Sequence, residues 1–64
     1  MSKEHELYKT ADDGGKPDWL REQAVDGLGK LDSEEANKCL GSLARDGGKP
    51  DWLREKALAK LSEK

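Results

Sequence analysis

No combination of side chains in this sequence forms a clear catalytic constellation. The chain has one cysteine, Cys39, and one histidine, His5, which a cysteine nucleophile would need as its base. No third residue that would orient the histidine is evident, and Cys39 lies beside an apolar helical stripe, so we interpret it as a small buried apolar residue. A single cysteine also excludes an intrachain disulfide and a multi-cysteine zinc site. The sequence therefore predicts no catalytic residue, no metal and no cofactor, and hence a protein that is not an enzyme.

Two glycine-rich turns offer a possible anion site. The segments 14–16 and 47–49 both read Gly-Gly-Lys and precede an expected helix start, where backbone N–H groups can hold a phosphate. The P-loop pattern is not met, because a proline follows each lysine and no Ser or Thr is placed to bind Mg²⁺. A plain turn is the favoured interpretation, and anion binding is the alternative.

Tryptophan and arginine side chains are stronger candidates, because these residue types dominate the energetics of protein interfaces. Trp19 lies about 130° from the centre of the apolar stripe of its helix, so we expect it on a flank, and Trp52 repeats this position. Either both tryptophans fold over their own turns, or one covers the contact between two repeats while its twin is exposed. The predicted partner-binding residues are Trp19, Trp52, Arg21, Arg54 and Lys56.

These candidates belong to a motif that occurs twice. The sequence D-G-G-K-P-D-W-L-R-E-x-A runs from Asp13 to Ala24 and again from Asp46 to Ala57, with an offset of 33 residues and eleven of twelve positions identical. The apolar positions around the motif match at the same offset. The chain is therefore predicted to be one domain, 1–64, made of two repeats, about 1–31 and 32–64.

Apolar residues with a helical period predict four helices. Leucine and alanine are the main apolar residues, and both favour helix. Gly27 lies on the second apolar stripe, which predicts the close approach of another helix. The four stripes are Leu7 and Ala11; Leu20, Ala24, Leu28 and Leu31; Ala36, Leu40, Leu43 and Ala44; and Leu53, Ala57 and Leu61.

Capping residues predict where these helices start. Ser2 is expected to cap a first helix over residues 3–12. Pro17 and Pro50 are expected as the first residues of the second and fourth helices. Asp32 is expected to begin the third, because it has the spacing of a capping box to residue 35. The predicted fold is all-α, with four short helices as two stacked antiparallel helix hairpins, which is a short α-solenoid.

Three segments resemble a known family. They are L-R-E-Q-A-V-D-G-L-G-K-L-D-S-E-E-A from Leu20, L-x-x-L-A-R-D from Leu40, and L-R-E-K-A-L-A-K-L from Leu53. They are similar to the HEAT-like repeats of the phycobilisome-lyase type, although the Gly-Gly-Lys-Pro turn is longer than in that family. The resemblance implies a right-handed stack of helix pairs, a binding role, and hydrogen bonds between the turn aspartate and the helix arginine (Asp13 with Arg21, Asp46 with Arg54).

Charge and hydropathy narrow the expected partners. The charged fraction is 41% but the net charge is only −2, which disfavours nucleic acid and anionic membranes. No apolar run approaches the roughly 18 residues of a membrane span, and no signal peptide is visible, so a soluble cytoplasmic protein is expected.

The expected function is a small non-catalytic protein–protein interaction module, with self-association as one form of it. The physical reason is that repeat arrays usually need three or more units to bury a continuous core, and two units leave apolar ends. The alternative is an accessory subunit that holds a protein substrate for an enzyme or a pigment-attachment system.

Overall fold

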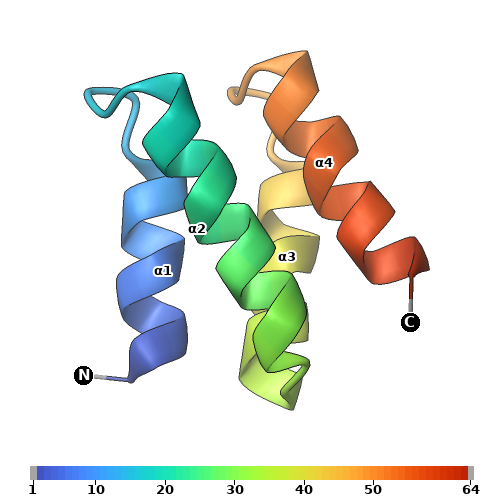
Figure 1. Ribbon diagram of the computed structural model, residues 1–64. Helices are drawn as coiled ribbons and strands as arrows, with labels where there is room; N and C mark the ends of the chain where they lie inside the picture. The colour runs from blue at the N-terminus through green and yellow to red at the C-terminus, as the bar shows by residue number, and fades with distance from the viewer. Residues whose placement is uncertain (1, 64) are drawn as a thin grey trace.

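The computed structural model describes residues 2–63 and forms four helices within that range. They are α1 (Lys3–Asp12), α2 (Asp18–Leu31), α3 (Glu34–Arg45) and α4 (Asp51–Ser62). Consecutive helices run in roughly opposite directions, and the α1–α2 and α3–α4 turns lie at the same end of the molecule (Figure 1). No strand occurs in the described residues. The prediction of an all-α chain with four helices is confirmed.

Serine side chains cap two of these helices. The Oγ atom of Ser2 accepts a hydrogen bond from the backbone N–H of His5 at 3.0 Å, as predicted. Ser33 caps α3 in the same way and accepts from the N–H of Ala36 at 3.0 Å. The prediction that Asp32 begins the third helix was wrong. Asp32 has φ 46° and is the left-handed C-cap of α2, a conformation that a short polar side chain tolerates.

The two prolines lie one position earlier than predicted. Pro17 and Pro50 are the N-cap residues of α2 and α4 and not their first helical residues. The carbonyl of Pro17 accepts the first helical hydrogen bonds, from the N–H groups of Leu20 and Arg21 at 3.1 and 3.2 Å. The fixed φ of proline positions this carbonyl, so the repeated Lys-Pro-Asp segment sets the same helix start in both repeats.

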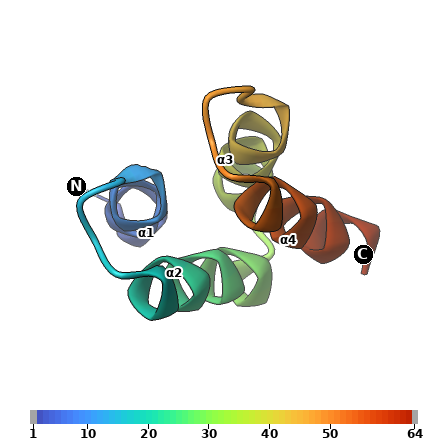
Figure 2. The same cartoon turned by 90° about the horizontal axis from the view of Figure 1, so that it is seen from above.

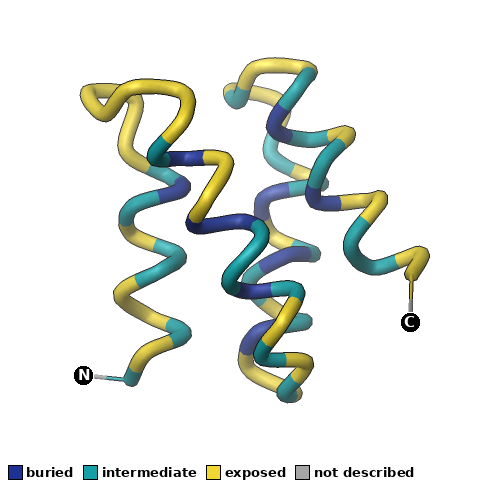
Figure 3. Tube along the Cα trace, in the orientation of Figure 1, coloured by how far each residue is buried: buried dark blue, intermediate teal, exposed yellow. Residues whose placement is uncertain are grey.

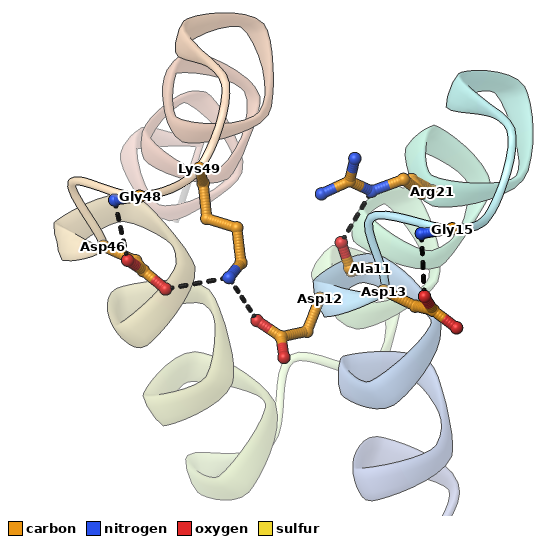
Figure 4. Close-up of polar contacts among 8 residues, drawn as sticks. All are labelled: Ala11, Asp12, Asp13, Gly15, Arg21, Asp46, Gly48 and Lys49. Carbon is orange, nitrogen blue, oxygen red and sulfur yellow. Dashed lines mark hydrogen bonds and ion pairs between the residues drawn. The ribbon is translucent and has the colours of Figure 1, made fainter.

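The two glycine-rich turns have the same hydrogen bonds. Asp13 Oδ1 accepts from the N–H of Gly15 at 2.8 Å, and Asp46 Oδ1 accepts from the N–H of Gly48 at 2.9 Å (Figure 4). No glycine among residues 2–63 has a positive φ. A Cβ atom at Gly15 would instead lie 3.2 Å from Asp13 Oδ1, so here the glycine makes room for the aspartate carboxylate.

The core lies where the helices face one another (Figure 3). Gly27 belongs to this packing, because a Cβ atom there would lie 3.1 Å from Leu7 Cδ1, which confirms the predicted close approach of another helix. Val25 is buried although it was not assigned to a stripe, and Leu20 is only partly buried and lies outside the core cluster. The buried apolar residues are Ala11, Ala24, Val25, Leu28, Ala36, Leu40, Leu43, Leu53 and Ala57.

The two repeats meet mainly through α2. This helix packs on α1 from its own repeat and on both α3 and α4 from the second repeat, and α1 also packs on α3. Seen from above, α1 and α4 do not meet (Figure 2). We call the contact between residues 2–31 and residues 32–63 the junction. Among the described residues, no helix is both long enough and apolar enough to cross a bilayer.

Candidate functional site

A tryptophan from one repeat and an arginine from the other meet in the junction. Trp52, near the start of α4, lies over the guanidinium group of Arg21 on α2, and the distance from Arg21 Cζ to the ring centroid is 5.7 Å. Arg21 is 5% exposed, and its Nε donates to the backbone carbonyl of Ala11 at 3.0 Å (Figure 4). One side chain therefore satisfies a carbonyl at the end of α1 and supports an aromatic ring from the other repeat by a cation–π contact.

This geometry differs from the turn brace implied by the family resemblance. The Nε of Arg21 binds the Ala11 carbonyl and not Asp13, whose carboxylate accepts from Gly15. In the second repeat, Arg54 Nη1 lies 3.8 Å from Asp51 Oδ1. Arg21 is thus a component of the junction, and its burial leaves it no surface to offer a partner.

Charged side chains surround the junction. Lys49 Nζ lies 2.7 Å from Asp12 Oδ1 and 2.9 Å from Asp46 Oδ2, so it links the two repeats (Figure 4). The hydrogen bonds with Asp12 and then Asp46 raise the pKa of Lys49. The pKa of the Asp46 carboxyl is lowered, first by Lys49 and then by the Gly48 N–H.

A second set of charges connects α2 to α4. Asp26 Oδ1 lies 3.2 Å from both Lys56 Nζ and Lys60 Nζ. Partial burial raises the pKa of the Asp26 carboxyl, but hydrogen bonds with Lys60 and Lys56 outweigh this, and the net pKa is lowered. Lys56, a predicted partner-binding residue, is therefore engaged within the chain.

The two tryptophans lie in unequal surroundings. Trp52 packs against the core, whereas Trp19, 33 residues earlier in the same local sequence, is 61% exposed. Leu58 is 54% exposed, whereas its repeat counterpart Val25 is fully buried. Trp19 and Leu58 are the exposed large apolar residues of the described chain. Duplication thus leaves one member of each pair uncovered.

The repeat counterparts of the junction residues form two surfaces. The Trp19 surface consists of Lys16, Trp19 and Gln23, which are the counterparts of Lys49, Trp52 and Lys56. The Arg54 surface consists of Ala44, Arg54 and Leu58. These residues are the counterparts of Ala11, Arg21 and Val25. Together with Asp51 and Glu55, they line a hollow of about 200 Å³. The Trp19 surface thus repeats the Trp52 side of the junction, and the Arg54 surface repeats the Arg21 side. Within the described residues of one chain, neither of these two surfaces has the opposite side of a junction packed on it.

The possible reactive groups do not come together. Cys39 is half-buried, and its thiol pKa is raised, first by burial and then by Glu35 and Glu4, which disfavours the thiolate that a nucleophile or metal ligand needs. No group of three or more His, Cys, Asp or Glu side chains within residues 2–63 is arranged to hold a metal ion. In both turns, the second glycine N–H donates to an aspartate of the chain, and that amide is thereby occupied.

Sequence reasoning missed two features of this site. Val25 was not assigned to the core. The residue 33 positions later, Leu58, is also apolar, and this repeated apolar position could have indicated a contact site. The Asp26 carboxylate was not paired with Lys56 and Lys60, and no local signal predicts that contact, because these residues lie on different helices. Comparison of the chain with protein-family models, curated proteins and solved structures finds no match.

Arg21→Ala should lower the free energy of unfolding by about 2 kcal/mol, because it leaves the Ala11 carbonyl without its donor and removes the support of Trp52. Arg54→Ala is the matched control, since Arg54 has the same sequence neighbours and is more exposed, and it should cost under about 0.5 kcal/mol. Urea unfolding followed by far-UV circular dichroism measures both. Equal losses for the two variants would contradict the assignment of Arg21 to the junction.

Proposed function

We propose that this chain is a small non-catalytic protein-binding module built as a short α-solenoid of two stacked, antiparallel helix hairpins of HEAT-like type. The Trp19 surface is its binding surface. Support for the helical stacking comes from the contacts of α1 with α2 and α3 with α4, and from the contact of both pairs through α2. Support for binding comes from the exposure of Trp19.

The observation that carries the proposal is the 61% exposure of Trp19, whereas its repeat counterpart Trp52 is partly buried and packs against the core. Terminal units of repeat arrays usually present a polar outer face. Here the outer face has a tryptophan instead, flanked by Lys16 and Gln23, which are both exposed. A large aromatic side chain with a polar rim is the usual composition of a protein-interface hot spot.

Charge favours a protein partner over nucleic acid. The net charge is −2, and acidic and basic residues are interspersed along the chain. A nucleic-acid surface needs a concentration of Lys and Arg that neutralises several phosphates. Lys49, Lys56 and Lys60 are moreover paired with carboxylates of the chain, so they are not available as a basic patch.

A photocrosslinking amino acid, p-benzoylphenylalanine, in place of Trp19 tests the proposal in the source cell. We expect irradiation to give a discrete protein adduct of higher mass than the single chain. The same amino acid in place of Lys30 is the control, because Lys30 is exposed near the other end of α2. If position 19 gives no more adduct than position 30, the Trp19 surface is not a binding surface.

A further inference from the structure

We propose that the partner of the Trp19 surface is the Arg54 surface of a second copy of this chain, so that copies associate head to tail. This inference rests on the proposed function and names the partner of the same surface. Each contact between copies would reproduce the junction that already exists between the two repeats. The structure therefore contains the template for the contact.

The central residues of the template are identical at the two exposed surfaces. In the junction, Trp52 lies over Arg21, whose Nε binds the Ala11 carbonyl. The repeat counterpart of Trp52, 33 residues earlier, is Trp19. The counterparts of Arg21 and Ala11, 33 residues later, are Arg54 and Ala44, so the three residue types are the same. If Trp19 of one copy lies over Arg54 of another, the guanidinium group can make the same cation–π contact and the same hydrogen bond to a carbonyl at the end of a helix.

The apolar contacts are also reproduced. Val25 lies four residues after Arg21 on α2 and is fully buried, and its counterpart on the Arg54 surface is Leu58, which is larger and 54% exposed. Trp19 and Leu58 are the two exposed large apolar residues of the described chain. The first belongs to the Trp19 surface and the second to the Arg54 surface. Head-to-tail association would cover both at once. Association through a two-fold Trp19–Trp19 contact would cover only one of them.

The charges around the template differ, and this difference sets the strength of the contact. The ion pairs of Asp26 with Lys56 and Lys60 have no equivalent, because their counterparts are Ala59, Gln23 and Gly27. These counterparts are uncharged, so they neither attract nor repel.

The counterparts of the Lys49 ion pairs would disfavour the contact between copies. In the junction, Lys49 lies between Asp46 and Asp12. The corresponding residues between copies are Lys16, Asp13 and Arg45, so two cations would share one carboxylate. The contact between copies is therefore weaker than the junction, and salt should strengthen it by screening the two cations.

The geometry also determines the form of the assembly. The Trp19 surface and the Arg54 surface are different, so the contact is heterologous and leaves one free surface at each end of every oligomer. Such contacts continue as open chains unless the rotation between subunits closes a ring. The wild-type chain should therefore grow beyond a dimer as its concentration rises, and it should not stop at a closed pair.

A mixing experiment tests the proposal by sedimentation equilibrium at up to millimolar concentration and about 0.5 M NaCl, where the like charges are screened. Trp19→Ala removes the Trp19 surface and keeps the Arg54 surface; Leu58→Glu does the reverse. Each variant alone should be monomeric, with an association constant at least about tenfold below the wild-type value. An equimolar mixture should form dimers, with a mass limit of about twice 7.1 kDa, because one good surface remains on each variant.

Three results would overturn the proposal: a wild-type chain that stays monomeric throughout, a Leu58→Glu variant that associates like the wild type, or a mixture that stays monomeric. Trp19 and Leu58 are exposed, so both variants should fold, and circular dichroism checks this; Lys30→Glu is the surface control and should associate like the wild type. A monomeric wild type together with a position-19 adduct to a different protein would refute self-association and leave the proposed binding function standing.

Discussion

Leu53→Ala should lower the free energy of unfolding by about 3 kcal/mol, whereas Leu20→Ala should lower it by less than about 1 kcal/mol. Leu53 is fully buried in the core. Leu20 occupies the same position of the first repeat but is only partly buried and lies outside the core cluster. Both residues stand in the sequence Asp-Trp-Leu-Arg-Glu at the start of a helix, so the change in helix propensity is the same and cancels in the comparison.

The size of this effect is large for so small a chain. At about 0.05–0.15 kcal/mol per residue, a 64-residue domain has a total stability of roughly 3–10 kcal/mol. Leu53→Ala would therefore remove a third or more of it. Urea unfolding at low protein concentration, followed by circular dichroism, measures both variants in the monomer. Losses that differ by less than about 1 kcal/mol would mean that the two repeats are equally covered, and would contradict the arrangement of the junction.

The helices and most of the core could be predicted from local pattern. Helical periodicity correctly assigned Leu40 and Ala57 to the core, because a residue on an apolar stripe near the middle of a helix is covered whichever neighbour packs there. Leu20 shows the limit of this reasoning. Its periodicity is the same as that of Leu53, but periodicity does not say which end of a repeat is covered by another repeat.

The start of α3 shows a second limit. Asp32 and Ser33 are adjacent, and both residue types are good N-caps. The choice between them depends on whether Asp32 adopts the left-handed conformation. In that conformation Asp32 ends α2 as its C-cap, and Ser33 is the N-cap of α3. Propensities that differ by a few tenths of a kcal/mol cannot decide this. The two helices that meet at Asp32 pack on one another, and that packing is not visible in the local sequence.

The candidate site was predictable as a set of residues but not as a geometry. The repeated motif contains Trp19 and Trp52 in identical surroundings in the sequence, so only the direction in which the repeats stack can distinguish them. The same direction buries Arg21 and leaves Arg54 partly exposed. A one-dimensional repeat identifies both members of each pair, and three-dimensional stacking determines which member is covered.

Trp52→Ala should lower the free energy of unfolding by about 3 kcal/mol, and Trp19→Ala by less than about 0.5 kcal/mol in the dilute monomer. Trp52 packs against the core and lies over Arg21. Its removal therefore forfeits apolar burial and uncovers a guanidinium group that the ring supports. Trp19 is largely exposed, so its removal takes away little that the folded chain uses. Thermal and urea unfolding, monitored by circular dichroism, give both values.

A double-mutant cycle with Arg21→Ala separates the cation–π contact from simple burial. We expect Trp52→Ala and Arg21→Ala to be coupled by about 0.5–1 kcal/mol, and Trp19→Ala and Arg21→Ala to add independently. The exposed tryptophan should matter only when copies meet, because association stabilises the folded state by mass action. The cost of Trp19→Ala should therefore rise with protein concentration, while that of Trp52→Ala already appears at low concentration. A large loss of stability on Trp19→Ala in the dilute monomer would show that Trp19 stabilises its own fold. The exposure of Trp19 would then no longer support a role in binding.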